Sequence, residues 1–96
     1  MSKEKYHMDA VASTGCVICR EFDGVRVDGQ VHHIAQGSEE RSDFMTACLC
    51  ETHHTGHLGV HGMGVKAFLR LYGLSSEYHL LGLVNKFRAQ DELYRR

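Results

Sequence analysis

Two short pairs of metal-binding residue types are the most informative feature of this sequence. Cys16 and Cys19 form a Cys-x-x-Cys pair near the start of the chain. Cys50 and His53 repeat this spacing later as Cys-x-x-His. Three thiolates and one imidazole suit a closed, tetrahedral structural zinc site, to which each pair contributes two ligands. We therefore expect these four residues to bind a structural Zn²⁺, against the alternative that the cysteines are small buried apolar residues.

Histidines outside this set form a second candidate site. His32 and His33 are adjacent in the sequence, and three more histidines lie shortly after the Cys50–His53 pair: His54, His57 and His61. A metal ion held by only two or three neutral imidazoles keeps open coordination positions, with which it can polarise a phosphodiester and stabilise a leaving oxygen. A further neutral imidazole can take the proton from an attacking water. Surface histidines or additional structural ligands would explain the same pattern.

Length and composition limit the classes of protein that fit. A chain of 96 residues is expected to form one domain with a small core, whose modest stability a structural metal would supplement. The formal net charge of -1 argues against a diffusely basic nucleic-acid-binding protein, so any contact with a polyanion must be local. Two disulfides would also use four cysteines, but residues 1–5 are polar and unlike a secretory signal, and no apolar run approaches membrane-spanning length. We therefore expect a reducing compartment and no membrane association.

The candidate ligands are positioned by a predicted order of helix, strand, loop, strand and helix. Residues 3–13 have helical spacing. Between residues 22 and 34, apolar β-branched residues broken by two Asp-Gly turns predict short strands. Residues 36–42 are polar and predict a loop, and residues 44–49 predict a strand that leads into the second metal-binding pair. On this strand we expect Cys48 to be a packing residue.

Two amphipathic helices are predicted after His61. The first has an apolar face with i, i+3, i+4 and i+7 spacing, made by Val65, Phe68, Leu69 and Tyr72. Gly73 supplies its C-terminal end. Ser75 or Ser76 can cap the second helix. The inward stripe of that helix consists of Leu80, Leu83, Val84 and Phe87.

The motifs, in chain order, resemble those of the HNH endonucleases. They are Cys-x-x-Cys, Val-His-His-Ile, Asp43, Leu-Cys-x-x-His-His, Gly-Val-His-Gly-Met-Gly and Phe-Leu-Arg-Leu-Tyr-Gly. Within that group the chain is most similar to the phage recombination-enhancement nucleases, the Ref family, over about residues 15–73. The resemblance implies an α+β fold of the treble-clef, ββα-metal type, braced by zinc and flanked by helices. Residues 74–96 would then be a C-terminal helical tail of a single domain formed by residues 1–96.

The resemblance also implies a role for each histidine of the second site. His33 matches the general base, and His32 matches a ligand of the catalytic divalent ion, which would be Mg²⁺, Mn²⁺ or Zn²⁺. His54 matches the helix-borne ligand, and His61 is taken as the last ligand with His57 in reserve. On one straight helix, residues seven apart would lie about 10 Å apart, too far for one ion. We therefore expect Gly56, Gly59 and Gly62 to break the helix, so that His61 folds back towards His54.

One residue of the family pattern has no counterpart. The middle asparagine of the HNH motif, which helps to orient the base, is missing, because the only asparagine in the chain is Asn85. Asp43 lies near the corresponding position. It would either orient a histidine or act as a plain turn or cap residue.

The implied function is metal-dependent hydrolysis of DNA phosphodiester bonds during phage or prophage recombination, in the cytoplasm of a bacterial host. The resemblance implies DNA and a RecA-type recombinase filament as partners, and we expect a monomer or a weak homodimer. Candidates for phosphate contacts, each equally well explained as a solvated surface charge, are Arg20, Arg41, Lys66 and Arg70. The alternative function is a non-catalytic zinc-binding module that contacts DNA or protein.

Overall fold

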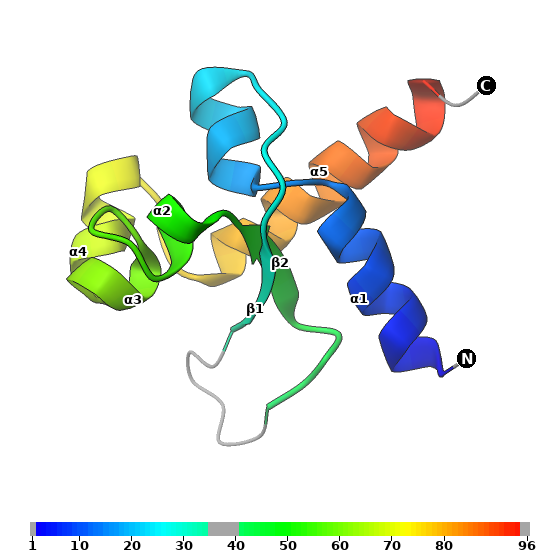
Figure 1. Ribbon diagram of the computed structural model, residues 1–96, viewed down its shortest axis with the longest axis horizontal. Helices are drawn as coiled ribbons and strands as arrows, with labels where there is room; N and C mark the ends of the chain where they lie inside the picture. Colours follow the sequence, from blue (N-terminus) through cyan, green and yellow to red (C-terminus); the bar gives the residue numbers. More distant parts are fainter. Residues whose placement is uncertain (1, 35–40, 95–96) are drawn as a thin grey trace.

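A two-stranded antiparallel hairpin lies at the centre of the molecule, with helices on both sides of it (Figure 1). This computed structural model describes residues 2–34 and 41–94. The elements together form a small α+β domain. In chain order they are α1 (Lys3–Ser13), the π-helical turn η1 (Cys19–Asp23), β1 (Gln30–His33), β2 (Thr46–Leu49), α2 (Glu51–His54), α3 (Val60–Met63), α4 (Val65–Tyr72) and α5 (Tyr78–Tyr94).

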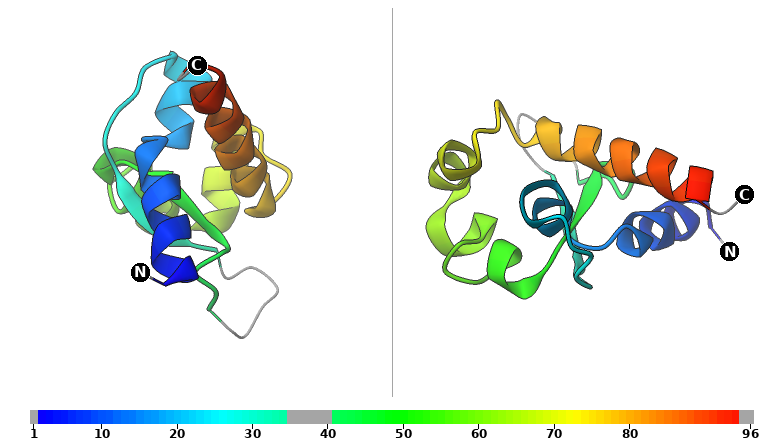
Figure 2. Two further views of the ribbon diagram at one scale, coloured as in Figure 1. Left: turned by 90° about the vertical axis from the view of Figure 1, so that its right-hand side faces the viewer. Right: turned by 90° about the horizontal axis from the view of Figure 1, so that it is seen from above.

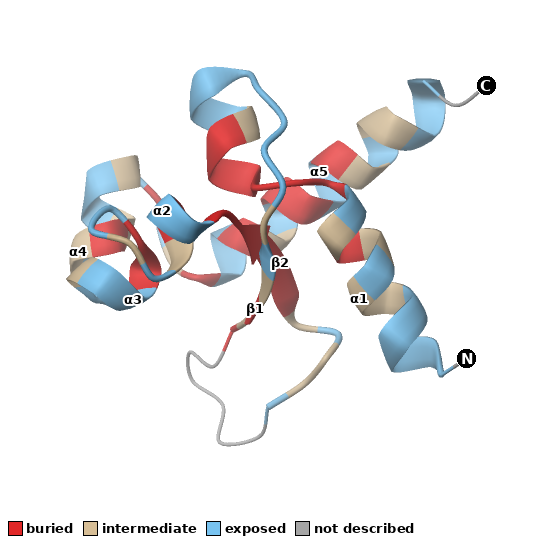
Figure 3. Ribbon diagram, in the orientation of Figure 1, coloured by how far each residue is buried: buried red, intermediate tan, exposed pale blue. Residues whose placement is uncertain are grey.

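Strand β2 is buried along its whole length. Helices α1 and α5 both pack against it, as the two views in Figure 2 show. Strand β1 pairs with β2 so that His32 lies opposite Ala47. Buried residues gather around this hairpin and on the inner faces of the helices (Figure 3). The largest fully buried side chains include Ile18, Ile34, Leu49, Phe68 and Leu80.

Three predicted helices are confirmed, and one of them ends at the predicted glycine. The Ser2 hydroxyl caps α1 by accepting a hydrogen bond from the backbone N–H of Lys5 at 3.0 Å. Helix α4 ends at Gly73, whose φ of 66° is the left-handed conformation that glycine adopts without strain. The predicted stripe of α5 is buried: Leu80, Leu83, Val84 and Phe87. Within the described ranges, no helix has the length and apolar character needed to cross a membrane.

The prediction of several strands between residues 22 and 34 was only partly right. Only Gln30–His33 forms a strand, whereas Phe22 lies in η1 and Val25 is exposed in a segment without strand pairing. The first Asp-Gly pair ends η1 instead of making a hairpin, because Gly24 adopts φ 68° and its N–H donates to the Cys19 carbonyl. A helical turn at the first cysteine pair thus replaces the expected strand.

The second strand is shorter than predicted. Strand β2 covers Thr46–Leu49, and residues 43–45 form a turn and bend before it. In this turn the N–H of Met45 donates to the Ser42 carbonyl at 3.1 Å. Most of the predicted loop over residues 36–42 lies outside the described residues, and residues 41 and 42 have no regular structure.

Arg20 connects η1 to the C-terminal helix α5. Its guanidinium donates two hydrogen bonds of 3.0 Å to the Asp91 carboxylate and one of 3.1 Å to the Thr14 carbonyl. The same group lies 4.4 Å from the ring centroid of Phe87. Sequence reasoning offered Arg20 for a phosphate contact, but the structure engages its side chain, which is 16% exposed, within the fold.

Loss of this connection should destabilise the protein measurably. We expect Arg20→Ala to lower the free energy of unfolding by about 2 kcal/mol, because it leaves a partly buried carboxylate and carbonyl without their donor. Lys5→Ala removes an exposed ion pair with Asp9 on α1 and should cost less than about 0.5 kcal/mol. Urea unfolding of both variants checks this, and equal stability would contradict the structural role of Arg20.

Candidate active site

The four residues predicted to bind zinc are brought together from two separate segments. Cys19 opens η1 and Cys16 lies one turn before it. Cys50 occupies the N-cap position of α2, and His53 lies within that helix. All four side chains are buried. We call this group the Cys3His cluster.

The ligand atoms of the Cys3His cluster have the spacing of a tetrahedral site. The sulfurs of Cys19 and Cys50 are 3.8 Å apart. His53 Nδ1 lies 3.2, 3.5 and 3.6 Å from the sulfurs of Cys50, Cys19 and Cys16, respectively. Zinc bond lengths of about 2.3 Å to sulfur and about 2.05 Å to nitrogen give tetrahedral edges of about 3.8 Å and about 3.6 Å. The donor set and its geometry therefore fit a structural zinc.

The buried thiols of the Cys3His cluster also favour a bound divalent cation. Burial raises the pKa of the Cys16 and Cys19 thiols, because a thiolate loses solvation in this environment. A divalent cation offsets that cost, since it stabilises the deprotonated thiolate that binds it. Cys48 lies outside the cluster and is buried in β2, where burial raises its pKa to about 11. Cys48 is therefore a packing residue, as predicted.

Three histidines from different elements form a second group, which we call the histidine triad. His32 lies on β1, His54 ends α2 and His61 lies on α3. Their ring centroids are 4.8 to 5.2 Å apart, and one nitrogen from each ring lies within 4.8 Å of the others. Burial, together with the two neighbouring imidazoles, lowers the pKa of His54. A neutral imidazole is the form that binds a metal ion, so the triad has the chemistry of an open metal site.

Glycines allow the triad to form. Helix α2 ends at His54 and α3 begins only at Val60, so the helix is broken as predicted. At Gly62 an added Cβ would lie 1.8 Å from the carbonyl oxygen of Gly56, and at Gly59 it would lie 2.6 Å from that of His54. Backbone packed this closely leaves no room for a side chain. His57, in the intervening turn, is exposed and lies outside the triad.

Two histidines of the triad have polar partners that sequence reasoning missed. His32 Nε2 lies 3.0 Å from Oε2 of Glu77, and both side chains are buried. His54 Nδ1 lies 3.2 Å from Oε1 of Gln30. Glu77 precedes α5 and Gln30 begins β1, so no local spacing in the sequence connects either one to its histidine. Only the alternation of side chains along β1 could have suggested that residues 30 and 32 share a face.

His33 is the last residue of β1, and its ring has different partners from the ring of His32. Its Nε2 lies 2.7 Å from Oδ1 of Asp43. Its Nδ1 lies 3.0 Å from a guanidinium nitrogen of Arg41. Arg41 can only donate, so the network assigns a neutral ring that donates from Nε2 to Asp43 and accepts at Nδ1. Asp43 thus contacts the predicted base directly.

The remaining cations predicted for phosphate contacts lie on α4. Lys66 and Arg70 are exposed and one helical turn apart. Helix α4 is packed against α3, which carries His61. Two of the four predicted cations are therefore exposed on one helix, Arg41 contacts His33, and Arg20 is held by Asp91.

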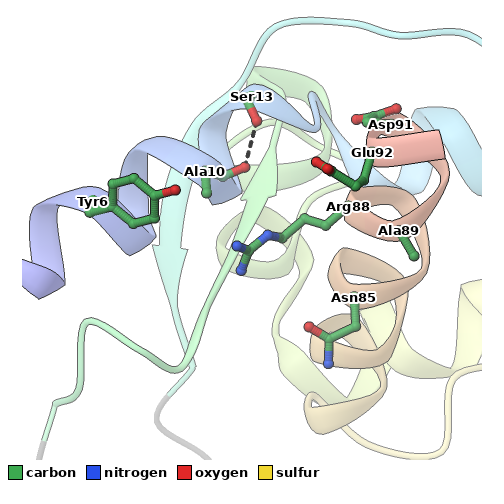
Figure 4. Close-up of a pocket in the computed structure, with 8 residues that line it drawn as sticks. All are labelled: Tyr6, Ala10, Ser13, Asn85, Arg88, Ala89, Asp91 and Glu92. Atoms are coloured by element: carbon green, nitrogen blue, oxygen red, sulfur yellow. Dashed lines mark hydrogen bonds between the residues drawn. The ribbon is translucent and has the colours of Figure 1, made fainter. Parts of the chain in front are cut away.

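A hollow of about 380 Å³ lies elsewhere, between α1 and α5 (Figure 4). Its lining residues are Tyr6, Ala10, Ser13, Asn85, Arg88, Ala89, Asp91 and Glu92. None of them belongs to the Cys3His cluster or to the histidine triad. The candidate chemistry is therefore not located in this hollow.

Comparison with family models gives a match over nearly the whole chain. The model described as recombination enhancement, RecA-dependent nuclease matches residues 1–94. Comparisons with curated proteins and with solved structures find no match. The matched range contains the Cys3His cluster and the histidine triad as well as His33 and Asp43.

Removing one cysteine of the cluster should release the structural metal. We expect Cys16→Ser to lose bound zinc and to lower the free energy of unfolding by at least about 4 kcal/mol, because metal binding contributes directly to folding. Cys48→Ala should keep its zinc and cost about 1–2 kcal/mol through lost packing. Atomic absorption and urea unfolding make the comparison. Wild-type zinc content in Cys16→Ser would contradict the assignment.

The close backbone contact at Gly62 gives a second test. We expect Gly62→Ala to lower the free energy of unfolding by about 3 kcal/mol, since its Cβ cannot coexist with the Gly56 carbonyl. Gly82→Ala is the matched control, because a Cβ there meets no atom within 4 Å and alanine favours the interior of α5 by up to about 1 kcal/mol. Thermal or urea unfolding measures both. A Gly62→Ala protein as stable as wild type would show that the turn between α2 and α3 is packed differently.

Proposed function

Since the chain belongs to the family of recombination-enhancement, RecA-dependent nucleases, we propose that it is a metal-dependent HNH endonuclease that hydrolyses DNA phosphodiester bonds. The observation that carries the proposal is the histidine triad together with the His33–Asp43 pair, which begins at the residue after His32 on β1. A metal site with open positions and a separate imidazole base are the two parts that such hydrolysis requires.

We propose a treble-clef, ββα-metal arrangement for these parts. The hairpin of β1 and β2 contributes His32, and the α2 segment that follows contributes His54. The Cys3His cluster holds the start of α2 to η1. A divalent ion bound by the triad, whether Mg²⁺, Mn²⁺ or Zn²⁺, would supply positive charge to the scissile phosphate and to the departing oxygen.

His33 acts as the general base in this proposal. Asp43 accepts the Nε2 proton and so keeps Nδ1 as the basic nitrogen, which takes a proton from the attacking water. Arg41 donates to Nδ1 in this structure, and it must leave before that nitrogen can accept a proton. A phosphate is a stronger acceptor for a guanidinium than a neutral imidazole. Bound DNA would therefore draw Arg41 away and free the base.

We propose Arg41, Lys66 and Arg70 as phosphate contacts. The exposed pair on α4 lies on the helix packed against α3, and Arg41 lies beside the base. With a formal net charge of -1, the chain alone should bind DNA weakly. A RecA-type filament on DNA, in the bacterial cytoplasm, would bring the enzyme and its substrate together.

A cleavage assay tests this function. Supercoiled and single-stranded DNA are incubated with protein and Mg²⁺ or Mn²⁺, with and without a RecA-type filament. We expect His33→Ala to lose at least about 100-fold in cleavage rate at unchanged zinc content, because it removes the general base. His79→Ala removes an exposed histidine of α5 and should cleave like wild type.

Two outcomes would contradict the proposal. Unchanged cleavage by folded, zinc-loaded His33→Ala would remove His33 from the mechanism. Absence of cleavage by wild type under every condition would favour a non-catalytic zinc-binding module.

A further inference from the structure

Glu77 is a buried carboxylate next to the histidine triad. It immediately precedes α5, and its side chain is 6% exposed. Its Oε2 lies 3.0 Å from Nε2 of His32, whose side chain is 5% exposed. A carboxylate withdrawn from water loses much solvation energy, and this cost is tolerated where the charge has a specific partner. Unlike a surface glutamate, Glu77 therefore depends on its contact with His32.

The contact decides which nitrogen of His32 is available. An imidazole has two ring nitrogens, and the partner of one selects the tautomer and leaves the other free to bind a metal. Because Nε2 donates to Glu77, Nδ1 of His32 is the nitrogen left for an ion. The ring centroids of His54 and His61 lie 5.2 and 5.1 Å from that of His32. Likewise, Nδ1 of His54 donates to Oε1 of Gln30, which leaves Nε2 of His54 as the nitrogen available to an ion.

The contact also adds negative charge beside a neutral ligand set. Three imidazoles carry no charge when they bind a metal, so a divalent ion would keep its full charge. Among the described residues, Glu77 is the carboxylate in hydrogen-bonding contact with a triad member. A carboxylate that accepts from a ligating imidazole makes that ligand more basic and fixes its orientation.

We infer that Glu77 is a positioning residue of the histidine triad, which holds His32 as an Nδ1 ligand and strengthens the binding of a divalent ion. The inference rests on the proposed function, because it takes the triad to be a metal site. Glu77 supplies no ligand atom to the triad itself. It contributes through His32, and it links the start of α5 to a site built by β1, α2 and α3.

Metal affinity measured apart from cleavage tests this role. Zinc-loaded protein is titrated with Co²⁺ or Mn²⁺ by calorimetry, and Co²⁺ absorption reports the coordination at the triad. Glu77→Gln keeps an oxygen that can accept from His32 but removes the charge, and we expect Kd to rise about tenfold. Glu77→Ala removes both features and should raise Kd about 100-fold. Glu51→Gln, an exposed carboxylate of α2, should leave Kd unchanged.

A nuclear magnetic resonance measurement on the unmodified protein covers the case in which a variant fails to fold. Ring ¹⁵N shifts of His32 should show a proton on Nε2 and, with a diamagnetic divalent ion such as Zn²⁺ added, a metal on Nδ1. A purely structural pair would lower stability in Glu77→Gln but leave Kd and the Co²⁺ spectrum as in wild type.

The outcomes separate this inference from the proposed function. Wild-type Kd in both Glu77 variants, or a His32 proton on Nδ1, would overturn the positioning role while leaving the nuclease proposal intact. If the zinc-loaded wild-type protein binds no second metal ion, the positioning role and the proposed nuclease function both fail, and the titration of wild type is enough to show this.

Discussion

The Cys3His cluster is the constraint on which the geometry of the rest depends. It joins η1 to α2, two segments that share no strand pairing, through four buried side chains. Because His53 belongs to this cluster and His54 belongs to the histidine triad, adjacent residues on one helical turn serve two different groups. The position of His54 is therefore fixed by the residue before it. A domain with so small a core has few other means of holding a four-residue helix in place.

The hairpin places the neighbouring residues His32 and His33 in different surroundings. His33 is the last residue of β1, and the two neighbouring rings lie in different environments. Each ring has a carboxylate at its Nε2, which is Glu77 for His32 and Asp43 for His33. The two carboxylates come from different parts of the chain and differ in burial. One environment is closed and suits a ligand, and the other is partly open and suits proton exchange with water.

Much of this arrangement could be predicted from sequence, for physical reasons. Helical periodicity and capping are local, so α1, α4 and the stripe of α5 were found correctly. The spacing of Cys16 and Cys19 is likewise a local property. The glycines between α2 and α3 indicated a broken helix, although not the backbone contact between Gly56 and Gly62.

The rest could not be predicted, because it depends on tertiary contacts. Val25 carries a strong strand propensity, but the turn at the first cysteine pair places it in an unpaired segment. From the sequence alone Arg20 looks like a surface cation, because its partner Asp91 lies on α5, far along the chain. Glu77 is separated from His32 by 45 residues, and nothing in the local sequence distinguishes it from a helix-capping residue.

Cys48 has a practical consequence for following this molecule in solution. It is completely buried in β2, and burial raises its pKa to about 11, so it reacts with thiol reagents only when the hairpin opens. A zinc ion at the Cys3His cluster would shield the other three cysteines from the same reagents. With zinc bound, the four thiols would report on two separate events, because three would react on release of the metal and Cys48 would react on separation of the hairpin from its helices.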